Sequence, residues 1–301
     1  MKKLVTHNGG FHADDVTAYA ILKEVLTKRG ETWILERTRD AEVIKNADIA
    51  FDIGFEYDTS RNRYDHHQRE RAGSRENGIL YAAAGLVWKH FGHDLCENDA
   101  VWSQIDRSLI SAIDAQDNGQ DVIKETYFKD IIFTQLGQYF YHFEPGPFEE
   151  TSPEILVSKF EEASEFARGI IVRALHNFNE YEKAFLEAKK VYEEAPDKTI
   201  LVFDKNYERP TWKRMSEFPE PIFVMYYTTK NDQWKVEAVP EHPESQKSRK
   251  LAPESWRGSG PEDMIAATGV VDATFCHPSG FLFGAKSFEG AMELAKKALL
   301  M

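Results

Sequence analysis

Histidines and aspartates gather in four short stretches of the first half of the chain, and both residue types bind divalent metal ions. The candidate metal ligands are His7, His12, Asp14, Asp52, His66, Asp114 and Asp117. Imidazole and carboxylate ligands without thiolates suit manganese, cobalt, iron or zinc better than calcium, which prefers oxygen ligands. A set of this size can hold two ions about 3.5–4 Å apart, joined by one carboxylate, and such a pair activates water against phosphate esters. These residue types therefore predict a metal-dependent phosphoesterase.

Each of these residues, taken alone, has a simpler interpretation. Asp14 is an ordinary first-turn acid of a helix, and Asp52 is an ordinary aspartate between a strand and a turn. Asp114 and Asp117 can be solvated acids at the end of a helix. Two adjacent imidazoles at residues 66–67 have little packing rationale after a strand. One shared metal site accounts for all of them together.

The elements that must position these side chains alternate between strands and helices. We expect strands at 3–6, 33–37, 49–53 and 63–65, and helices at 14–28 and 41–46. This order predicts a parallel α/β sheet. Ligands of an open parallel sheet collect beyond the carboxyl ends of its strands, so the four stretches are expected to meet there. Asp52, at the end of a central strand, is the expected shared carboxylate.

The rest of the chain predicts further helices and a second, smaller domain. We expect helices at 77–91, 153–194 and 288–299, one or two helices over 99–114, and strands at 199–203, 222–227, 234–239 and 280–285. Prolines and a glycine at 144–153 break regular structure and indicate a boundary. The predicted fold is α/β: a parallel-sheet metal-binding domain (1–150), a helical connector (151–195) and a smaller α/β carboxyl-terminal domain (196–301).

Composition excludes several classes of protein. The 301 residues are 42% hydrophobic and 13% aromatic, which is typical of a folded chain with a core. The formal net charge of −13 excludes bulk electrostatic coating of nucleic acid. Cys96 and Cys276 form no CxxC pair, which favours a reducing compartment. With no leader-like segment and no apolar run near the ~20 residues of a membrane helix, we expect a cytoplasmic protein that does not bind membranes.

The motifs of the chain resemble those of one known superfamily. They are Thr-His-Asn-Gly-Gly-Phe-His-Ala-Asp-Asp (6–15), Asp-Ile-Gly (52–54), Tyr-Asp-His-His-Gln (64–68) and Asp-Ala-Gln-Asp-Asn-Gly (114–119). This series is similar to that of the DHH phosphoesterases. Its details, together with Leu-Ala-Pro-Glu-Ser-Trp-Arg-Gly (251–258) and Phe-Cys-His-Pro-Ser-Gly-Phe (275–281), resemble the melanocyte-proliferating-gene-one family of exonuclease-like proteins. The resemblance spans nearly the whole chain.

The resemblance implies a DHH-type domain with two divalent ions, of the manganese type. It implies that His7, His12 and Asp14 are first-cluster ligands, that Asp52 is the shared carboxylate, and that His66 comes from the Asp-His-His motif. His12 departs from the superfamily, most members of which have an aspartate at that position. An aspartate of the fourth cluster completes the set; we favour Asp114, with Asp117 as the alternative.

The catalytic group implied by the resemblance comprises His67 with Asp52 and His66. His67 is expected beside the reaction centre, where it would orient a ligand or donate to the leaving oxygen. In the second domain the candidate substrate-binding residues are Arg257, His277 and Gly280. Arginine offers a planar fork for phosphate, and glycine lets backbone amides approach an anion.

The leading functional hypothesis is a 3′-to-5′ exonuclease that acts on single-stranded RNA or short oligonucleotides. A small-molecule phosphatase or pyrophosphatase is the alternative within enzymes, and the acidity of the chain favours it slightly. The alternative from another class is a non-catalytic metal- or nucleotide-binding module. The sequence leaves the oligomeric state open.

Overall fold

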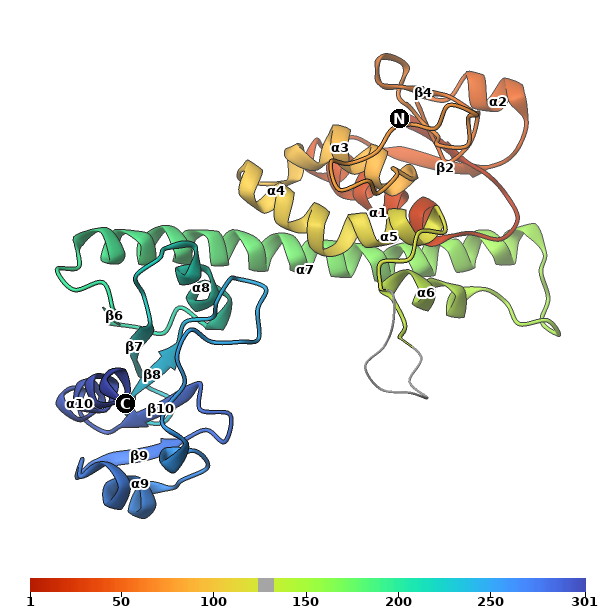
Figure 1. Cartoon of the computed structure of the whole chain (residues 1–301). Coiled ribbons are helices and arrows are strands. Elements are labelled where there is room, and N and C mark those ends of the chain that lie inside the picture. Colours follow the sequence, from red (N-terminus) through yellow and green to blue (C-terminus); the bar gives the residue numbers. More distant parts are fainter. Residues whose placement is uncertain (124–132) are drawn as a thin grey trace. The chain divides into compact units, whose positions relative to one another are not determined.

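The computed structural model describes residues 1–123 and 133–301, which divide into two compact units. The first unit comprises residues 1–179 and the second comprises residues 180–301. The division falls within the 42-residue helix α7 (Pro153–Glu194) (Figure 1). The predicted long helix over 153–194 is confirmed, and both units share it.

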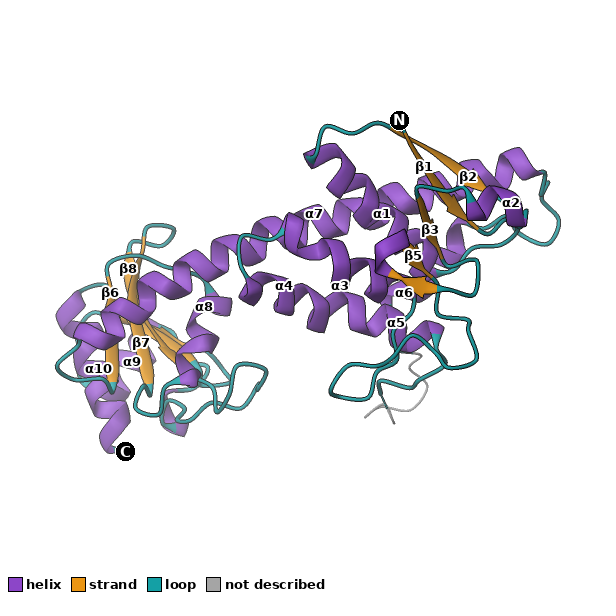
Figure 2. Cartoon of the chain, turned by 90° about the horizontal axis from the view of Figure 1, so that it is seen from above, coloured by secondary structure: helices purple, strands orange, loops and turns teal. Residues whose placement is uncertain are grey.

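The first unit contains a five-stranded sheet with the order β2-β1-β3-β5-β4 (Figure 2). The strands are β1 (Lys2–Thr6), β2 (Trp33–Arg37), β3 (Ile49–Phe51), β4 (Tyr57–Asp58) and β5 (Arg63–Tyr64). β1 pairs in parallel with β2 and β3, and β3 pairs in parallel with β5. Only β4 is antiparallel, through its pairing with β5. The carboxyl ends of β1, β3 and β5 therefore lie next to one another.

Helices cover this sheet and form the core with it. They are α1 (Ala13–Lys28), α2 (Ala41–Lys45), α3 (Ala83–Leu95), α4 (Asp99–Ile105), α5 (Ser111–Asp117) and α6 (Leu136–Phe140), with 3-10 turns at Thr59–Arg61 and Tyr141–Phe143 and a π-helical turn at Asp106–Ile110. α1 is buried along most of its length and packs against α3. Four residues of α7, Phe160, Ala163, Ala167 and Ile171, join the same apolar core. The burial of α1 fixes the place of the loop that precedes it.

The second unit is built around another five-stranded sheet, with the order β6-β7-β8-β10-β9. Its elements are β6 (Ile200–Phe203), α8 (Arg209–Arg214), β7 (Phe223–Thr228), β8 (Gln233–Ala238), α9 (Pro261–Thr268), β9 (Ala273–Cys276), β10 (Leu282–Ala285) and α10 (Phe288–Leu300), with 3-10 turns at Met215–Glu217 and Glu254–Trp256. β6 and β7 are parallel, and the remaining pairs are antiparallel. One core lies around α10, and a second includes Phe185 and Tyr192 of α7.

The predicted α/β fold is confirmed, and the differences from the prediction are local. β4, α6, α8, α9 and β9 were not predicted. The helix expected from residue 77 begins at Ala83, because Gly78 has a φ of +85° and its amide closes a turn onto the Arg75 carbonyl. The stretch 99–114, with one or two expected helices, contains α4 and the start of α5, and the π-helical turn at Asp106–Ile110 lies between them. In the described part of the chain no helix has both the length and the apolarity to cross a membrane.

Two helical glycines provide a matched test of this fold. A Cβ at Gly85 of α3 would overlap the carboxylate of Asp114 on α5, whereas a Cβ at Gly169 of α7 meets no described atom within 4 Å. We expect Gly85→Ala to lower the free energy of unfolding by about 1–3 kcal/mol through overpacking. Gly169→Ala should raise it by roughly 0.5–1 kcal/mol, because alanine has the higher helix propensity. Urea denaturation measures both, and equal stability of the two variants would contradict the close contact at Gly85.

Candidate metal centre

Three neighbouring strands of the first sheet each lead into a polar residue of the candidate metal centre, the group of histidines and aspartates described below. β1 leads into His7, β3 into Asp52, and β5 into Asp65 and His66. Asp52 has a φ of +54°, a left-handed conformation that glycine, asparagine and aspartate adopt more readily than other residues. This turn directs the chain away from the sheet immediately after β3. The strand order thus brings residues far apart in sequence to one edge of the sheet.

Two helices contribute the remaining side chains. His12 directly precedes α1, and its amide donates to Asp15 Oδ1 at 2.9 Å. This bond fixes the first turn of α1, which carries both Asp14 and Asp15. Asp117 is the last residue of α5. The buried start of α1 and the end of α5 therefore face the strand ends.

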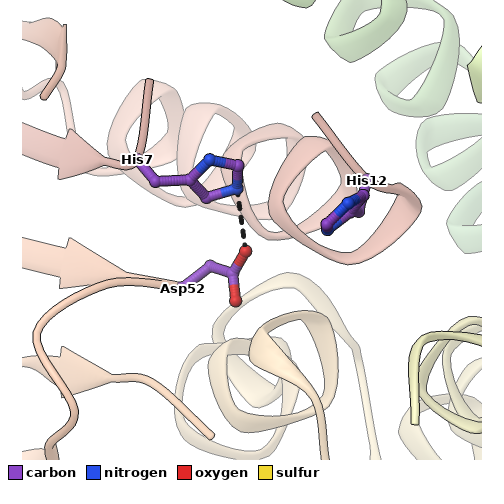
Figure 3. Close-up of side chains that lie close together, drawn as sticks. All are labelled: His7, His12 and Asp52. Atoms are coloured by element: carbon purple, nitrogen blue, oxygen red, sulfur yellow. Dashed lines mark ion pairs between the residues drawn. The ribbon is translucent and has the colours of Figure 1, made fainter. Parts of the chain in front are cut away.

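His7 has a defined orientation between two carboxylates. Its Nδ1–H donates to the Asn8 carbonyl oxygen at 3.2 Å, so Nε2 is the nitrogen available for a ligand. Nε2 lies 3.2 Å from Asp15 Oδ2 and also 3.2 Å from Asp52 Oδ2. Figure 3 shows the His7–Asp52 pair. Burial lowers the pKa of His7, but the close contacts and negative charges of these two carboxylates outweigh it and raise the pKa to about 10. The lone pair of His7 Nε2 would face two carboxylates, so this nitrogen must carry a cation, either a proton or a metal ion.

His66 is the second imidazole surrounded by carboxylates. Its Nε2 lies 3.3 Å from Asp52 Oδ1, 3.2 Å from Asp117 Oδ2 and 3.6 Å from Asp14 Oδ2. Only 3% of His66 is exposed. Asp52 thus presents one oxygen to His7 and the other to His66.

The buried carboxylates repel one another strongly. Asp14 is fully buried, and this burial, followed by the charges of Asp52 and Asp117, raises its pKa well above the usual range. Burial raises the pKa of Asp15 as well. Burial also acts to raise the pKa of Asp52, but its close contacts with the imidazoles of His66 and His7 outweigh burial and lower it. The centre is therefore an anionic site that is stabilised by positive charge.

Several buried atoms of the centre have no hydrogen-bond partner within the described residues. They are Asp14 Oδ1, Asp15 Oδ2, both carboxylate oxygens of Asp52 and both ring nitrogens of His66. Buried polar groups are otherwise nearly always paired, and carboxylate oxygens and imidazole nitrogens are metal ligands. The donor set therefore fits divalent transition-metal ions.

Three overlapping groups of atoms have the spacing of metal ligands. Within each group the ligand atoms lie within 4.8 Å of one another, and the groups are His7–His12–Asp52, Asp52–His66–His67 and His12–Asp14–Asp117. Asp52 belongs to two of the groups, and so does His12. Such sharing is the arrangement required for two ions with a common carboxylate.

Asp65 orients His67 at the border of the centre. Its Oδ1 accepts the amides of His66 and His67 and lies 2.7 Å from His67 Nδ1. The hydrogen bond to Asp65 raises the pKa of His67, with smaller contributions from the charges of Asp52 and Asp117. The His67 side chain is about half exposed, unlike the buried His66. It can therefore reach a bound ligand.

The structure brings Asp117, and not the favoured Asp114, to the groups of potential ligands. Asp114 Oδ2 instead lies 2.7 Å from Arg75 Nη1, and its Oδ1 accepts the Gly85 amide at 2.9 Å. Arg75 also binds Asp106 at 2.6 Å. Burial raises the pKa of Asp114 to about 7, against the opposing effect of Arg75. Asp114 therefore joins α5 to α3 and to the loop that carries Arg75.

Two further aspartates at the centre, Asp15 and Asp65, were not among the predicted ligands. Their only sequence signal is that each adjoins a predicted ligand, Asp14 or His66. Asp15 fixes the first turn of α1 and faces His7, whereas Asp65 holds His67. Both act on neighbours that the motifs do identify.

The three candidate substrate-binding residues lie together within the second unit. Arg257 Nε donates to the Ala252 carbonyl at 2.9 Å, and a Cβ at Gly280 (φ +71°) would lie 2.7 Å from this nitrogen. His277 Nδ1 accepts the Ser279 amide at 3.1 Å, and the His277 ring lies 4.6 Å from that of Phe281. The absence of a side chain at Gly280 is thus what lets Arg257 lie against this turn.

Comparison with known proteins gives matches over almost the whole chain. The family model MYG1_exonuc, described as an uncharacterised protein family (UPF0160), matches residues 3–299. The MYG1 exonuclease of Homo sapiens is 30% identical over 99% of this chain and 85% of its own length. The MYG1 protein C694.04c of Schizosaccharomyces pombe is 30% identical over 99% of this chain and 97% of its own. A structure of RecJ with Mn²⁺ from Thermus thermophilus is 10% identical, with a TM-score of 0.30 over 100% of this chain and 52% of that one, a likeness too slight to carry an inference.

Metal should stabilise the first unit, because a cation relieves the repulsion among its buried carboxylates. With Mn²⁺ at 100 times its dissociation constant, binding to the folded state alone adds about 2.7 kcal/mol of stability. We expect MnCl₂ to raise the Tm in differential scanning fluorimetry and EDTA to reverse the rise. Asp52→Asn should abolish the response, whereas Asp99→Asn, at a side chain that is 95% exposed, should retain it. A Tm that does not respond to Mn²⁺ would contradict the metal centre.

Asp114 and Asp117 should behave differently when each is replaced. Asp117→Asn should reduce the Mn²⁺ content after loading, measured by mass spectrometry, and leave the urea midpoint nearly unchanged. Asp114→Ala should lower the free energy of unfolding by about 3 kcal/mol, because it removes one partner of a buried ion pair. Its metal content at temperatures where it is folded should match that of the wild type. The reverse pattern would assign the ligand role to Asp114.

Proposed function

This chain belongs to the MYG1_exonuc family, and from this membership we propose that it is a metal-dependent phosphoesterase that hydrolyses the phosphodiester bonds of nucleic acid. The resemblance to the melanocyte-proliferating-gene-one family that the motifs indicate is thereby confirmed. The observation that carries the proposal is the set of buried, unpartnered aspartate and histidine atoms at three strand ends and two helix ends.

We assign the metal ligands as His7, His12, Asp14, Asp52, His66 and Asp117, and we propose two Mn²⁺ ions. The inclusion of Asp52 in two groups of potential ligands supports its role as the shared carboxylate. When bound, the ions would supply Lewis-acid polarisation of the phosphoryl oxygen and acidify a water molecule. The Asn8 carbonyl holds His7 with Nε2 towards Asp52, so the imidazole is oriented before any ligand binds.

His67 is the residue that we propose as the proton donor. Asp65 raises its pKa, which enlarges the protonated fraction near neutral pH. With Nδ1–H directed at Asp65, the other ring nitrogen remains to donate to the leaving oxygen. Its half-exposed side chain can contact a substrate, whereas the buried His66 can contact only the groups of the centre.

Because the chain has a net charge of −13, a polyanionic substrate can bind only where positive charge is concentrated locally. Arg69 and Arg71 are exposed on the segment after His67, and Arg71 lies 3.5 Å from Asn118 of the fourth cluster. Arg75 is committed to Asp106 and Asp114 and is not free to bind phosphate. We therefore propose Arg69 and Arg71, rather than Arg75, as contacts to the substrate backbone.

More specifically, we propose that the protein is a 3′-to-5′ exonuclease that acts on single-stranded RNA or short oligonucleotides. The names of the human and cattle relatives, both MYG1 exonucleases at 30% and 31% identity, support attack from a strand end. We propose Arg257, His277 and Gly280 as further substrate-binding residues, because an arginine lies against a side-chain-free turn there. The net charge of −13 favours short substrates over long polyanions.

The proposal is tested with an RNA oligonucleotide carrying a fluorophore at its 5′ end, in the presence of Mn²⁺. Progressive shortening from the 3′ end is the expected result. Asp52→Asn and His66→Ala should each lower the rate by about 100-fold or more, since loss even of an outer contact of a metal site costs 10–100-fold. Asp99→Asn serves as the matched control.

Two other outcomes would each overturn part of this proposal. Hydrolysis of pyrophosphate or a phosphomonoester with the oligonucleotide left intact would make the protein a small-molecule phosphatase. Bound Mn²⁺ without turnover of any phosphoester would make it a non-catalytic binding module.

A further inference from the structure

The first unit contains a pocket that lies apart from the metal centre and is lined by different side chains. Its volume is about 440 Å³, within the ~300–1,000 Å³ of small-molecule sites. It lies between α2 and the segment that follows Asp52, and its lining includes Ile44, Lys45, Ile53, Phe55, Arg39 and Arg61. Among the described lining residues none is a ligand of the proposed metal centre.

Phe55 is the unusual residue of this pocket. Its side chain is at the surface, with 72% of the residue exposed, and its backbone has a φ of +55°. A bulky residue in the left-handed region is strained, and such strain persists where a site requires it. Gly54 beside it has a φ of +105°, and a Cβ there would lie 3.2 Å from Ile44 Cγ2. An aromatic ring is thus held next to an apolar wall without being buried by it.

The rim of the pocket is positively charged. Arg39 and Lys45 are exposed and have no ion-pair partner among the described residues. Arg61 forms an ion pair with Glu56 at 2.6 Å, and Glu56 is the one acid of the described lining. Arg63 forms part of the floor and donates to the carbonyls of Lys45 and Ala47. In a chain with a net charge of −13, this local excess of cations favours an anionic ligand.

We propose that this pocket binds a nucleotide, with the base on the Phe55 ring and the phosphate at Lys45 and Arg39. An apolar wall with an exposed ring suits a planar base, since bases stack on aromatic side chains whatever their sequence. Two cations with no ion-pair partner in the described part of the chain, Arg39 and Lys45, suit a phosphate group. Neither an apolar ligand nor inorganic phosphate uses both features.

The pocket is connected to the metal centre through one short loop. Asp52 contributes to the centre, and Phe55, three residues later, contributes to the pocket. The Phe55 amide donates to Asp65 Oδ2 at 2.6 Å, and Asp65 Oδ1 holds His67. A nucleotide on the Phe55 ring therefore lies two contacts away from the proposed proton donor. It is either a residue of the substrate strand or a free nucleotide.

Calorimetric titration of the full chain with AMP in EDTA tests the pocket apart from the metal centre. Binding without metal does not depend on the proposed hydrolysis, so the two proposals fail separately. We expect AMP to bind, and adenosine and inorganic phosphate each to bind at least about tenfold more weakly, since each lacks one of the two contacts. Absence of AMP binding would overturn the proposal.

Substitutions in the pocket test whether AMP binds there. Phe55→Asn removes the ring but suits a left-handed backbone, and Lys45→Glu reverses one charge. Each should weaken AMP binding by about tenfold or more, whereas Phe55→Trp retains it. Lys286→Glu, at an exposed lysine of the second unit, makes the same change in net charge and should have no effect. Unchanged binding in both Phe55→Asn and Lys45→Glu would place AMP elsewhere and overturn the proposal. Circular dichroism establishes that each variant is folded.

Competition distinguishes the two sources of the nucleotide. In EDTA, displacement of AMP by a single-stranded oligonucleotide would assign the pocket to the substrate strand. Simultaneous binding of both would assign it to a free nucleotide. Either result, together with the loss of binding in Phe55→Asn, supports a nucleotide pocket.

Discussion

Electrostatic repulsion among buried carboxylates is the constraint on which the first unit depends. Asp14, Asp15 and Asp52 have almost no contact with water, and Asp117 is nearly as protected. Two unit charges 4 Å apart interact by about 4 kcal/mol at an effective dielectric constant of 20, so the set cannot remain fully ionised without cations. Two imidazoles, His7 and His66, lie between the carboxylates, so the cluster holds more carboxylates than imidazoles.

Much of the surrounding structure holds these groups in place. Parallel pairing of β1, β3 and β5 aligns three strand ends. The packing of the buried helix α1 against α3 fixes the position of its first turn, which carries Asp14 and Asp15. Arg75, Asp114 and Gly85 tie α5 to α3 outside the centre, which sets where Asp117 at the end of α5 lies. The energetic cost of gathering like charges is thus offset by packing and by ion pairs of residues that are not among the potential metal ligands.

Most of this site was predictable, because a strand-end aspartate or histidine in a parallel sheet can be recognised from local sequence. His7 and Asp52 each follow a short apolar run that forms a strand, whereas His66 follows the two-residue strand β5 and is marked instead by the adjacent imidazole of His67. The choice between Asp114 and Asp117 was not predictable, since both lie on α5 and the difference arises from Arg75, about 40 residues earlier in the chain. The pocket at Phe55 was not predicted, although Ile53 and Gly54 of the Asp-Ile-Gly motif line it, because its wall depends on the left-handed turn after β3. Short elements such as β4 and β9 give too little periodicity to be seen.

The most direct test of a shared metal centre is anomalous X-ray diffraction from crystals of the full chain grown with Mn²⁺. We expect two manganese peaks enclosed by the side chains that we assign as ligands, with Asp52 in contact with both. Manganese bound only outside this group of side chains, or no anomalous signal at saturating metal, would contradict it.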